Sequence, residues 1–182
     1  MSTVTTPLVP WTERLEQTSA LDPVVDAVRP LAAALVADPA RRDLLRGRWL
    51  GHAVHPMLTD LPTGLWTSAL ALDLLGGPSA APAARRLIGL GLLTVPPTAI
   101  TGWAEWSGAE QREQRVGLVH AVSNVAAVVG FTASWRARRR GDQRRGRSLA
   151  LGAATALGVG AYLGGHLVAA RKLSSRHPAF DG

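Results

Sequence analysis

Five histidines are the residues of this chain with the widest range of possible chemistry. They are His52, His55, His120, His166 and His177. Imidazole nitrogen is a common ligand of haem iron, zinc and copper. The 182-residue chain has no cysteine, which excludes thiolate zinc sites, cysteine-ligated iron–sulfur clusters and cysteine nucleophiles. Metal chemistry therefore has to come from histidine and carboxylate.

Long apolar helices must position these histidines, because charges are missing from most of the chain. Charged residues make up 18% of it, against about 25% in soluble domains. We expect four membrane-crossing helices, at about residues 57–75, 86–105, 116–136 and 148–170. The first requires that Asp60 and Asp73 are tolerated, and Asp73 is expected to face water at the helix end. A soluble four-helix bundle is the alternative, but residues 121–131 offer almost no polar face.

The sequence thus predicts an all-α protein, a four-transmembrane-helix bundle over residues 51–171 with a tail at 172–182. Residues 1–50 differ and predict short amphipathic helices on the membrane surface. Asp22-Pro23 and Asp38-Pro39 each place an N-cap before a proline, which is a helix-start signal.

Small residues recur every four positions in the fourth expected span, at Gly152, Ala156, Gly160 and Gly164. Such a ridge lets helix backbones approach closely in lipid, although a chain rich in alanine and glycine can produce it by chance. We expect no repeat of fixed period beyond such ridges.

The connection between the third and fourth spans is strongly basic. It holds Arg136, Arg138, Arg139, Arg140, Arg144, Arg145 and Arg147, with Asp142 opposing them. Arginines beside a span indicate the positive-inside rule and contact with anionic lipid. Nucleic-acid binding is the less favoured alternative, because no aromatic residues alternate with these arginines. We expect a multi-pass protein of a bacterial plasma membrane with this loop in the cytoplasm. The opposite orientation stays open, because the polar N-terminus has no signal peptide to carry it across.

The alternation of four spans brings four ionisable groups to one face of the membrane. His55 and Asp60 begin the first span, His120 lies about one turn inside the third, and His166 lies about one turn before the end of the fourth. Polar residues within spans are costly and mark sites. We therefore expect either haem b between His120 and His166, or a transition-metal ion bound by His55, Asp60, His120 and His166.

Two further side chains are expected to support these ligands. Asn124 follows His120 by four residues, and Tyr162 precedes His166 by four, so each pair shares a helical face. Ligating imidazoles usually donate their second N–H to such a neighbour. The alternative is that each imidazole only forms a hydrogen bond to a neighbouring helix.

Three segments resemble a known family. Residues 51–66 read GHAVHPMLTDLPTGLW and resemble the His-Pro-x-His-Pro entry to the first span of domain-of-unknown-function family 2231, a bacterial four-span membrane family. VGLVHAVSN at 116–124 and GGHL at 164–167 are similar to its third and fourth spans, so the resemblance covers about 48–170 and is actinobacterial in character. Ala53 stands where the first proline is usual. Some actinobacterial relatives carry a Rieske-type iron–sulfur domain, so the resemblance implies redox work.

The leading functional hypothesis is a membrane redox component that binds haem or metal and exchanges electrons with a partner protein. The alternatives are a non-catalytic scaffold or assembly partner, and a small proton-coupled carrier that uses Asp60 and the histidines as a relay. An enzyme is not favoured, because the chain has no Walker loop, dinucleotide fingerprint, His-Glu-x-x-His motif or serine elbow. No catalytic residue is assigned.

Overall fold

The computed structural model describes residues 8–174, and helices make up most of them. The α-helices are α1 (Leu8–Gln17), α2 (Asp22–Leu35), α3 (Pro39–Leu45), α4 (His55–Leu75), α5 (Ala81–Trp106), α6 (Gln111–Arg139) and α7 (Gln143–Gly165). A π-helical turn, His166–Ala170, continues α7. Within 8–174 there is no strand, so the all-α prediction is confirmed. The expected tail at 172–182 lies mostly outside the described residues.

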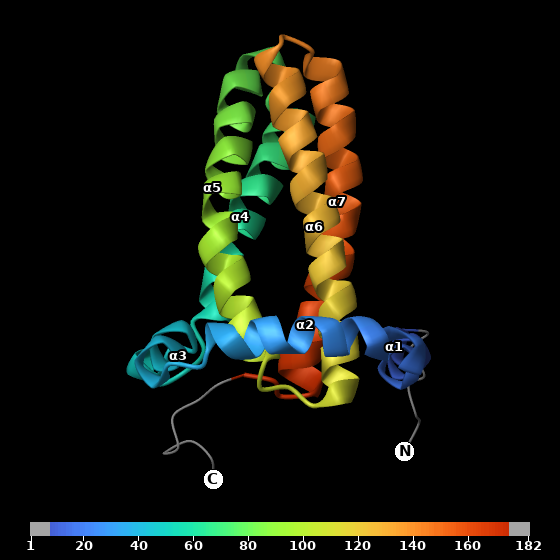
Figure 1. The fold of residues 1–182 in the computed structure, drawn as a ribbon. Coiled ribbons are helices and arrows are strands. Elements are labelled where there is room, and N and C mark those ends of the chain that lie inside the picture. The colour runs from blue at the N-terminus through green and yellow to red at the C-terminus, as the bar shows by residue number, and fades with distance from the viewer. Residues whose placement is uncertain (1–7, 175–182) are drawn as a thin grey trace, which may run out of the picture.

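The four long helices form two antiparallel hairpins, α4 with α5 and α6 with α7 (Figure 1). Both hairpin turns lie at one end of the bundle, and α1, α2 and α3 lie across the other end. Among the described residues, three helical stretches are long and apolar enough to cross a membrane: Pro78–Trp106, Gln111–Arg139 and Gln143–Ala170. Their outward faces expose large apolar side chains such as Leu93 and Val129, as lipid-facing helices do.

The helix ends are defined by local signals in the sequence. Glu110 and Glu113 form a reciprocal capping box at the start of α6. Asp142 accepts a hydrogen bond from the backbone N–H of Arg145 at the start of α7. Gly141, with φ +85°, makes the left-handed turn between these two helices. The helices α6 and α7 begin earlier than the expected spans 116–136 and 148–170, because their caps lie in charged sequence that precedes the apolar stretches.

The cluster with the most buried apolar residues lies in the half of the bundle nearest the hairpin turns. Trp66 of α4 stacks on Phe131 of α6 with ring centroids 4.3 Å apart. The indole N–H of Trp66 donates to the carbonyl of Ile88, 3.2 Å away. Small side chains surround this stack, which lets the helix backbones approach. Gly91 is essential to the fit, because a Cβ there would lie 2.3 Å from the indole nitrogen.

A buried ion pair closes the core at the same end. Both terminal nitrogens of the Arg138 guanidinium donate to the Asp73 carboxylate, one of them at 2.8 Å. Arg138 also donates to Ser134 at 3.1 Å. Both charged side chains are at most 5% exposed. The prediction that Asp73 faces water is therefore wrong, because an arginine from a helix distant in sequence neutralises it inside the bundle.

The two hairpins repeat one another. The buried positions of α4 include Pro62, Trp66, Ala69 and Asp73, and the residues 65 positions later in α6 are Ala127, Phe131, Ser134 and Arg138, all buried. The same holds between α5 and α7 at a shift of 62, which pairs Ala84 with Gly146, Ile88 with Ala150, Gly91 with Ala153 and Thr101 with Leu163.

Equivalent positions of the two hairpins also contact each other, as Trp66 does with Phe131 and Asp73 with Arg138. A contact between equivalent positions is the mark of a twofold relation. The bundle therefore has a pseudo-twofold axis along its length, a parallel internal repeat. This correspondence has one shift for α4 and α6 and another for α5 and α7, so it is not a repeat of fixed period in the sequence. It preserves burial while keeping few identical residues.

The N-terminal helices are anchored to one end of the bundle. Arg115 of α6 forms a 2.7 Å ion pair with Asp22, and this hydrogen bond lowers the pKa of the Asp22 carboxyl below its usual value. Val25 and Ala32 of α2 pack with Trp106 and Leu118. Asp22 is thus the first residue of α2 and pairs with arginine, which corrects its predicted role as an N-cap.

The other predicted cap is present. Asp38 accepts a hydrogen bond from the backbone N–H of Arg41 at 2.7 Å. The following segment is also fastened to the bundle, because the side chain of Arg46 donates to the carbonyl of Ala104 at 3.1 Å.

Candidate functional site

His55 lies in the first turn of α4 and is held by α5. Its Nδ1 is 3.0 Å from the carbonyl oxygen of Thr98 and 3.3 Å from the hydroxyl of Thr101. The ring packs against Gly102, where a Cβ would lie 2.8 Å from Cε1. Because the carbonyl can only accept, Nδ1 carries the hydrogen and Nε2 keeps its lone pair. Within residues 8–174, Nε2 of His55 makes no hydrogen bond.

His120 is held by α7 in the same way. Its Nδ1 is 2.8 Å from the carbonyl oxygen of Gly160, and its ring packs against Gly164, where a Cβ would lie 3.0 Å from Cε1. Nδ1 therefore carries the hydrogen here too. The Asn124 amide nitrogen lies 2.9 Å from Nε2 and donates to it. The expected contact between Asn124 and His120 is thus present, on the ring nitrogen opposite the carbonyl.

The two histidines are equivalent in the internal repeat. His120 follows His55 by the 65 positions that relate α6 to α4, and Gly160 and Gly164 follow Thr98 and Gly102 by the 62 that relate α7 to α5. His55 also continues the stripe of Pro62 and Ala69, at steps of seven residues, so it shares their inward helix face. The structure therefore holds the two imidazoles in matching surroundings, at equivalent positions of α4 and α6.

His166 has different surroundings. Its Nε2 lies 2.7 Å from a carboxylate oxygen of Glu16 in α1. Arg171 binds the same carboxylate with two nitrogens, one at 2.6 Å. Burial disfavours the charged carboxylate, but the hydrogen bonds from Arg171 and His166 outweigh this effect and lower the pKa of Glu16 below its usual value. His166 thus fastens α1 to the bundle.

The remaining predicted site residues lie outside the pair. Tyr162 contacts Trp11 of α1, with ring centroids 6.1 Å apart. Asp60 is exposed, because five residues turn an α-helix by about 140° from the His55 face. The described residues contain no group of three or more histidines and carboxylates that could hold a metal ion. The structure therefore gives His55 and His120 matching surroundings, whereas Asp60 is exposed and His166 pairs with Glu16.

Two parts of this arrangement were missed in the sequence. Glu16 lies in an ordinary amphipathic segment, and nothing near it indicates a contact 150 residues away. The shared carbonyl and glycine contacts of His55 and His120 had a visible signal. Aligning the two hairpins on their histidines matches Gly102 with Gly164 once a gap of three residues is placed in the second hairpin.

Comparison with known proteins agrees with this architecture. A family model described as "Predicted membrane protein (DUF2231)" matches residues 51–176. No curated protein and no solved structure matches the chain. The matched segment contains the two hairpins and the His55–His120 pair, and it leaves out α1, α2 and α3. The chain belongs to the DUF2231 family of predicted membrane proteins, as the motif around His55 predicted.

Proposed function

We propose that the protein is a multi-pass component of a bacterial plasma membrane that binds haem b or a transition-metal ion between His55 and His120. The bound group would exchange electrons with a partner protein. The turn between α6 and α7 would face the cytoplasm, in keeping with its arginines.

The proposal includes α4 as a fourth membrane-crossing helix. Its 21 residues give a length of about 31 Å, which matches a hydrocarbon core of about 30 Å. α4 packs along α5 for most of its length (Figure 1). Of its two aspartates, Asp73 is neutralised inside the bundle by Arg138, and Asp60 lies near the helix end where water is within reach. Neither charge therefore opposes insertion strongly.

The observation that carries the proposal is the matched anchoring of the two imidazoles. Each Nδ1–H donates to a backbone carbonyl of the neighbouring helix, which is the second contact that metal-ligating histidines usually make. This contact fixes the ring orientation and leaves Nε2 as the basic nitrogen. His55 and His120 would hold an iron or copper ion through these two basic nitrogens.

The residues fit such a group in type and tautomer. Nε2 of His55 is free of hydrogen bonds within the described chain, and Nε2 of His120 would exchange the Asn124 amide for the metal. Haem iron supplies a one-electron couple when bound. The chain's own contribution would be to orient both rings and to keep bulk water away, since both histidines are at least half-buried.

A non-catalytic scaffold is the second candidate, and one contact favours it. Both ring nitrogens of His120 already have partners, at Gly160 and Asn124. A histidine satisfied in this way needs no ligand to be stable inside a membrane helix. In this case the two histidines serve only to join the helices of each hairpin.

The test is the absorption spectrum and metal content of protein purified from a haem-replete bacterial host. We expect a Soret band or a stoichiometric metal ion in the wild type. His55→Ala and His120→Ala should both lose it, because the two rings are the ligands.

The controls are His166→Ala and His52→Ala, which remove imidazoles that the proposal does not use, and each variant is checked by circular dichroism. Loss of the band in His166→Ala but not in His55→Ala would restore the pair first predicted from the sequence. A colourless, metal-free wild-type protein would overturn the proposal and favour the scaffold.

A further inference from the structure

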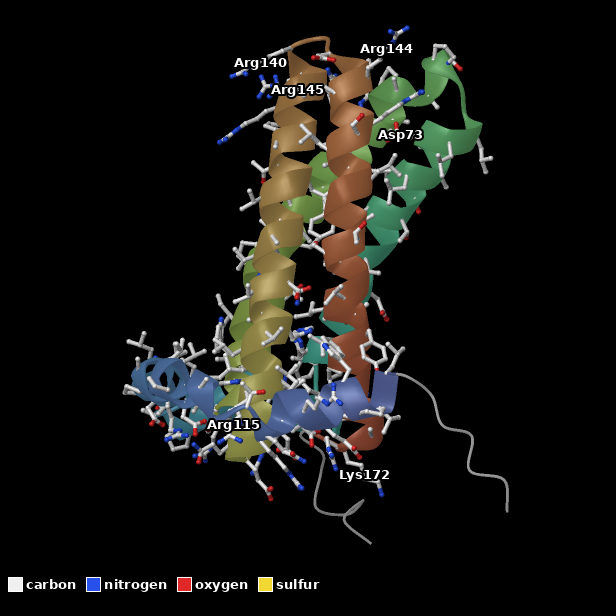
Figure 2. All side chains as sticks on the ribbon, turned by 90° about the vertical axis from the view of Figure 1, so that its right-hand side faces the viewer. Asp73, Arg115, Arg140, Arg144, Arg145 and Lys172 are labelled. Carbon is white, nitrogen blue, oxygen red and sulfur yellow. The ribbon has the colours of Figure 1, made fainter. Side chains whose placement is uncertain are left out.

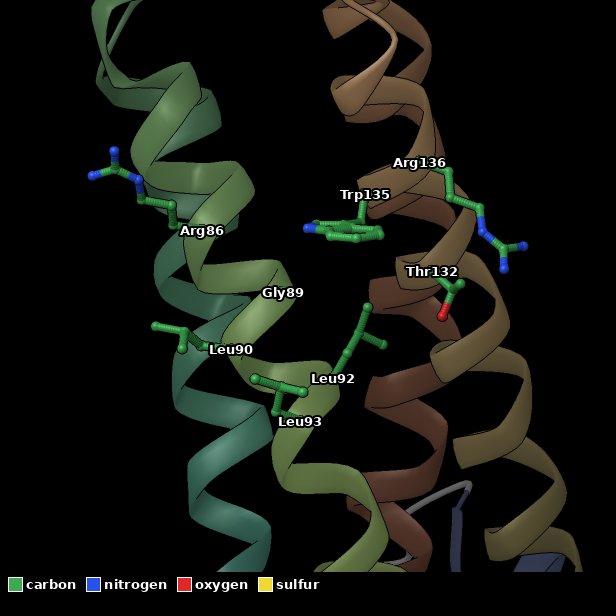
Figure 3. Close-up of a pocket in the computed structure, with 8 residues that line it drawn as sticks. All are labelled: Arg86, Gly89, Leu90, Leu92, Leu93, Thr132, Trp135 and Arg136. Carbon is green, nitrogen blue, oxygen red and sulfur yellow. The ribbon is translucent and has the colours of Figure 1, made fainter.

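An apolar groove runs along the outside of the bundle between α5 and α6. Its volume is about 510 Å³, and it is lined mainly by Leu90, Leu92, Leu93, Thr132 and the indole of Trp135. Figure 3 shows Trp135 extending from α6 toward Gly89 of α5 across the end of the groove, with Arg86 and Arg136 on either side. Gly89 permits this position, because a Cβ there would lie 2.8 Å from the indole nitrogen.

A basic pocket adjoins the groove at this end. It has a volume of about 350 Å³ and is lined by Trp135, Arg136, Arg139 and Arg140. The two cavities share Trp135 and Arg136, so apolar and basic surface are continuous. Arg139 lies over the Trp135 ring at 4.9 Å. Among the described residues, no carboxylate pairs with the guanidinium groups of this pocket.

Comparison of the two hairpins shows that the fold does not require tryptophan and arginine at the positions that line the groove and the basic pocket. On the other hairpin, Trp135, Arg136, Arg139 and Arg140 correspond to Leu70, Ala71, Leu74 and Leu75. Arg86 corresponds to Ser148. The same helix positions therefore carry uncharged residues, three of them leucine, on the other side of the bundle. Four arginines and a tryptophan are thus present on the α5–α6 side of the bundle and absent from the equivalent positions of α4 and α7.

We propose that the α5–α6 groove with its basic pocket binds one anionic phospholipid. The acyl chains cover Leu90 and Leu93, which are 51% and 74% exposed. The phosphate lies on Arg136, Arg139 and Arg140, whose guanidinium groups suit bidentate contact with phosphate oxygens. Tryptophan at the boundary between apolar and charged surface matches the headgroup region of a bilayer.

Membrane topology alone would not require this arrangement. The positive-inside rule counts charges near a span and is indifferent to their place on the helix surface. Arg144 and Arg145 would serve topology equally well and lie outside both cavities. Figure 2 shows them at the turn, with Arg140 nearby. These two residues therefore offer a control that removes the same charge from the same loop.

The experiment is native mass spectrometry of the full chain in detergent, titrated with phosphatidylglycerol or with phosphatidylcholine of the same acyl chains. We expect one tightly retained phosphatidylglycerol per chain. The Arg136→Gln/Arg139→Gln variant should weaken its retention by at least about tenfold, since each arginine near the surface adds about 1 kcal/mol. The Arg144→Gln/Arg145→Gln variant should retain it as the wild type does.

A second pair of variants tests the acyl groove. Thr132→Trp fills the groove from α6 and should release the lipid, whereas Thr67→Trp, at the equivalent exposed position of α4, should not. Equal retention of the two lipids, equal effects of the two arginine pairs, or displacement by glycerol phosphate alone would each overturn the proposal. None of these readouts depends on haem or metal, so this inference can fail while the proposed function stands.

Discussion

At the scale of single residues, the buried charges decide how the helices are joined. Arg138 and Asp73 form the most buried ion pair between the two hairpins. Arg138→Ala leaves the buried Asp73 carboxylate with only the more distant, partly exposed Arg147, 3.6 Å away, and we expect a loss of about 3 kcal/mol in unfolding free energy, at the low end for breaking a buried pair. The measurement is thermal or denaturant unfolding in detergent, followed by circular dichroism.

A double variant separates the pair from the packing around it. Asp73→Leu/Arg138→Leu removes both charges and keeps apolar volume, so it should be more stable than Arg138→Ala. If the single variant unfolds like the wild type, the ion pair has no structural role.

The Glu16 carboxylate makes the attachment of α1 dependent on pH. Its pKa in the folded chain is below the ordinary value of 4.5, so its stabilising effect is complete above that value and is lost as the pH falls through the lowered one. We expect α1 to detach in acid while the bundle stays folded. Hydrogen exchange of the α1 amides, corrected for the intrinsic effect of pH, measures this.

Glu16→Gln is the matched control, because it keeps the shape of the side chain and removes the titrating group. In this variant α1 should exchange faster at neutral pH and show little further change in acid. A variant with the same acid transition as the wild type would assign the effect to another carboxylate, such as Asp22.

At the scale of helices, glycines matter where they meet a side chain. A Cβ at Gly91 would lie 2.3 Å from the Trp66 indole, whereas a Cβ at Gly152 would have nothing within 4 Å. Gly91→Ala should therefore displace the Trp66–Phe131 stack and cost about 1–3 kcal/mol. Gly152→Ala should leave the melting temperature unchanged or slightly higher. Equal effects of the two would contradict the packing described here.

The same contrast shows what could be read from the sequence. The small-residue ridge in α7 was visible, and two of its members contact α6 as expected: Gly160 meets Asn124, and Gly164 meets His120. Gly152, in perfect register with them, contacts nothing. Spacing reports which residues share a helix face, but the crossing of the partner helix decides how far along that face the contact extends.

The sequence predicts how far along its helix each histidine lies, but not which neighbouring helix that histidine faces. Counting turns from each span end correctly put His55 and His120 near the same end, because the rise per residue is constant. Which histidine faces which depends on the neighbour each helix packs against. α1 folds back onto His166 through Glu16, and no periodicity within either segment indicates a contact so distant in sequence.

At the scale of the whole molecule, the two equivalent hairpins are accompanied by features that have no counterpart across the pseudo-twofold axis. The hairpins match in their buried positions and in the anchoring of His55 and His120. The α1–α3 segment covers one end only, and the tryptophan–arginine surface lies on one side only. The proposed haem or metal ligands thus belong to the part that the two hairpins share, whereas the proposed lipid site lies where they differ.

The topology of the molecule follows from whether α4 crosses the membrane. The native chain has no cysteine, so single cysteines can be introduced at exposed positions without a background. If α4 crosses, Arg48→Cys and Ser79→Cys lie on opposite sides, and Gln111→Cys lies on the side of residue 48. A membrane-impermeant maleimide added to intact cells should then label either residue 79 alone or residues 48 and 111 together, according to the orientation. Labelling of 48 with 79, and not with 111, would mean that only the three most apolar helices cross. We expect a labelling pattern in which α4 crosses, because two equivalent hairpins related by a pseudo-twofold axis place both of their turns on the same side of the membrane.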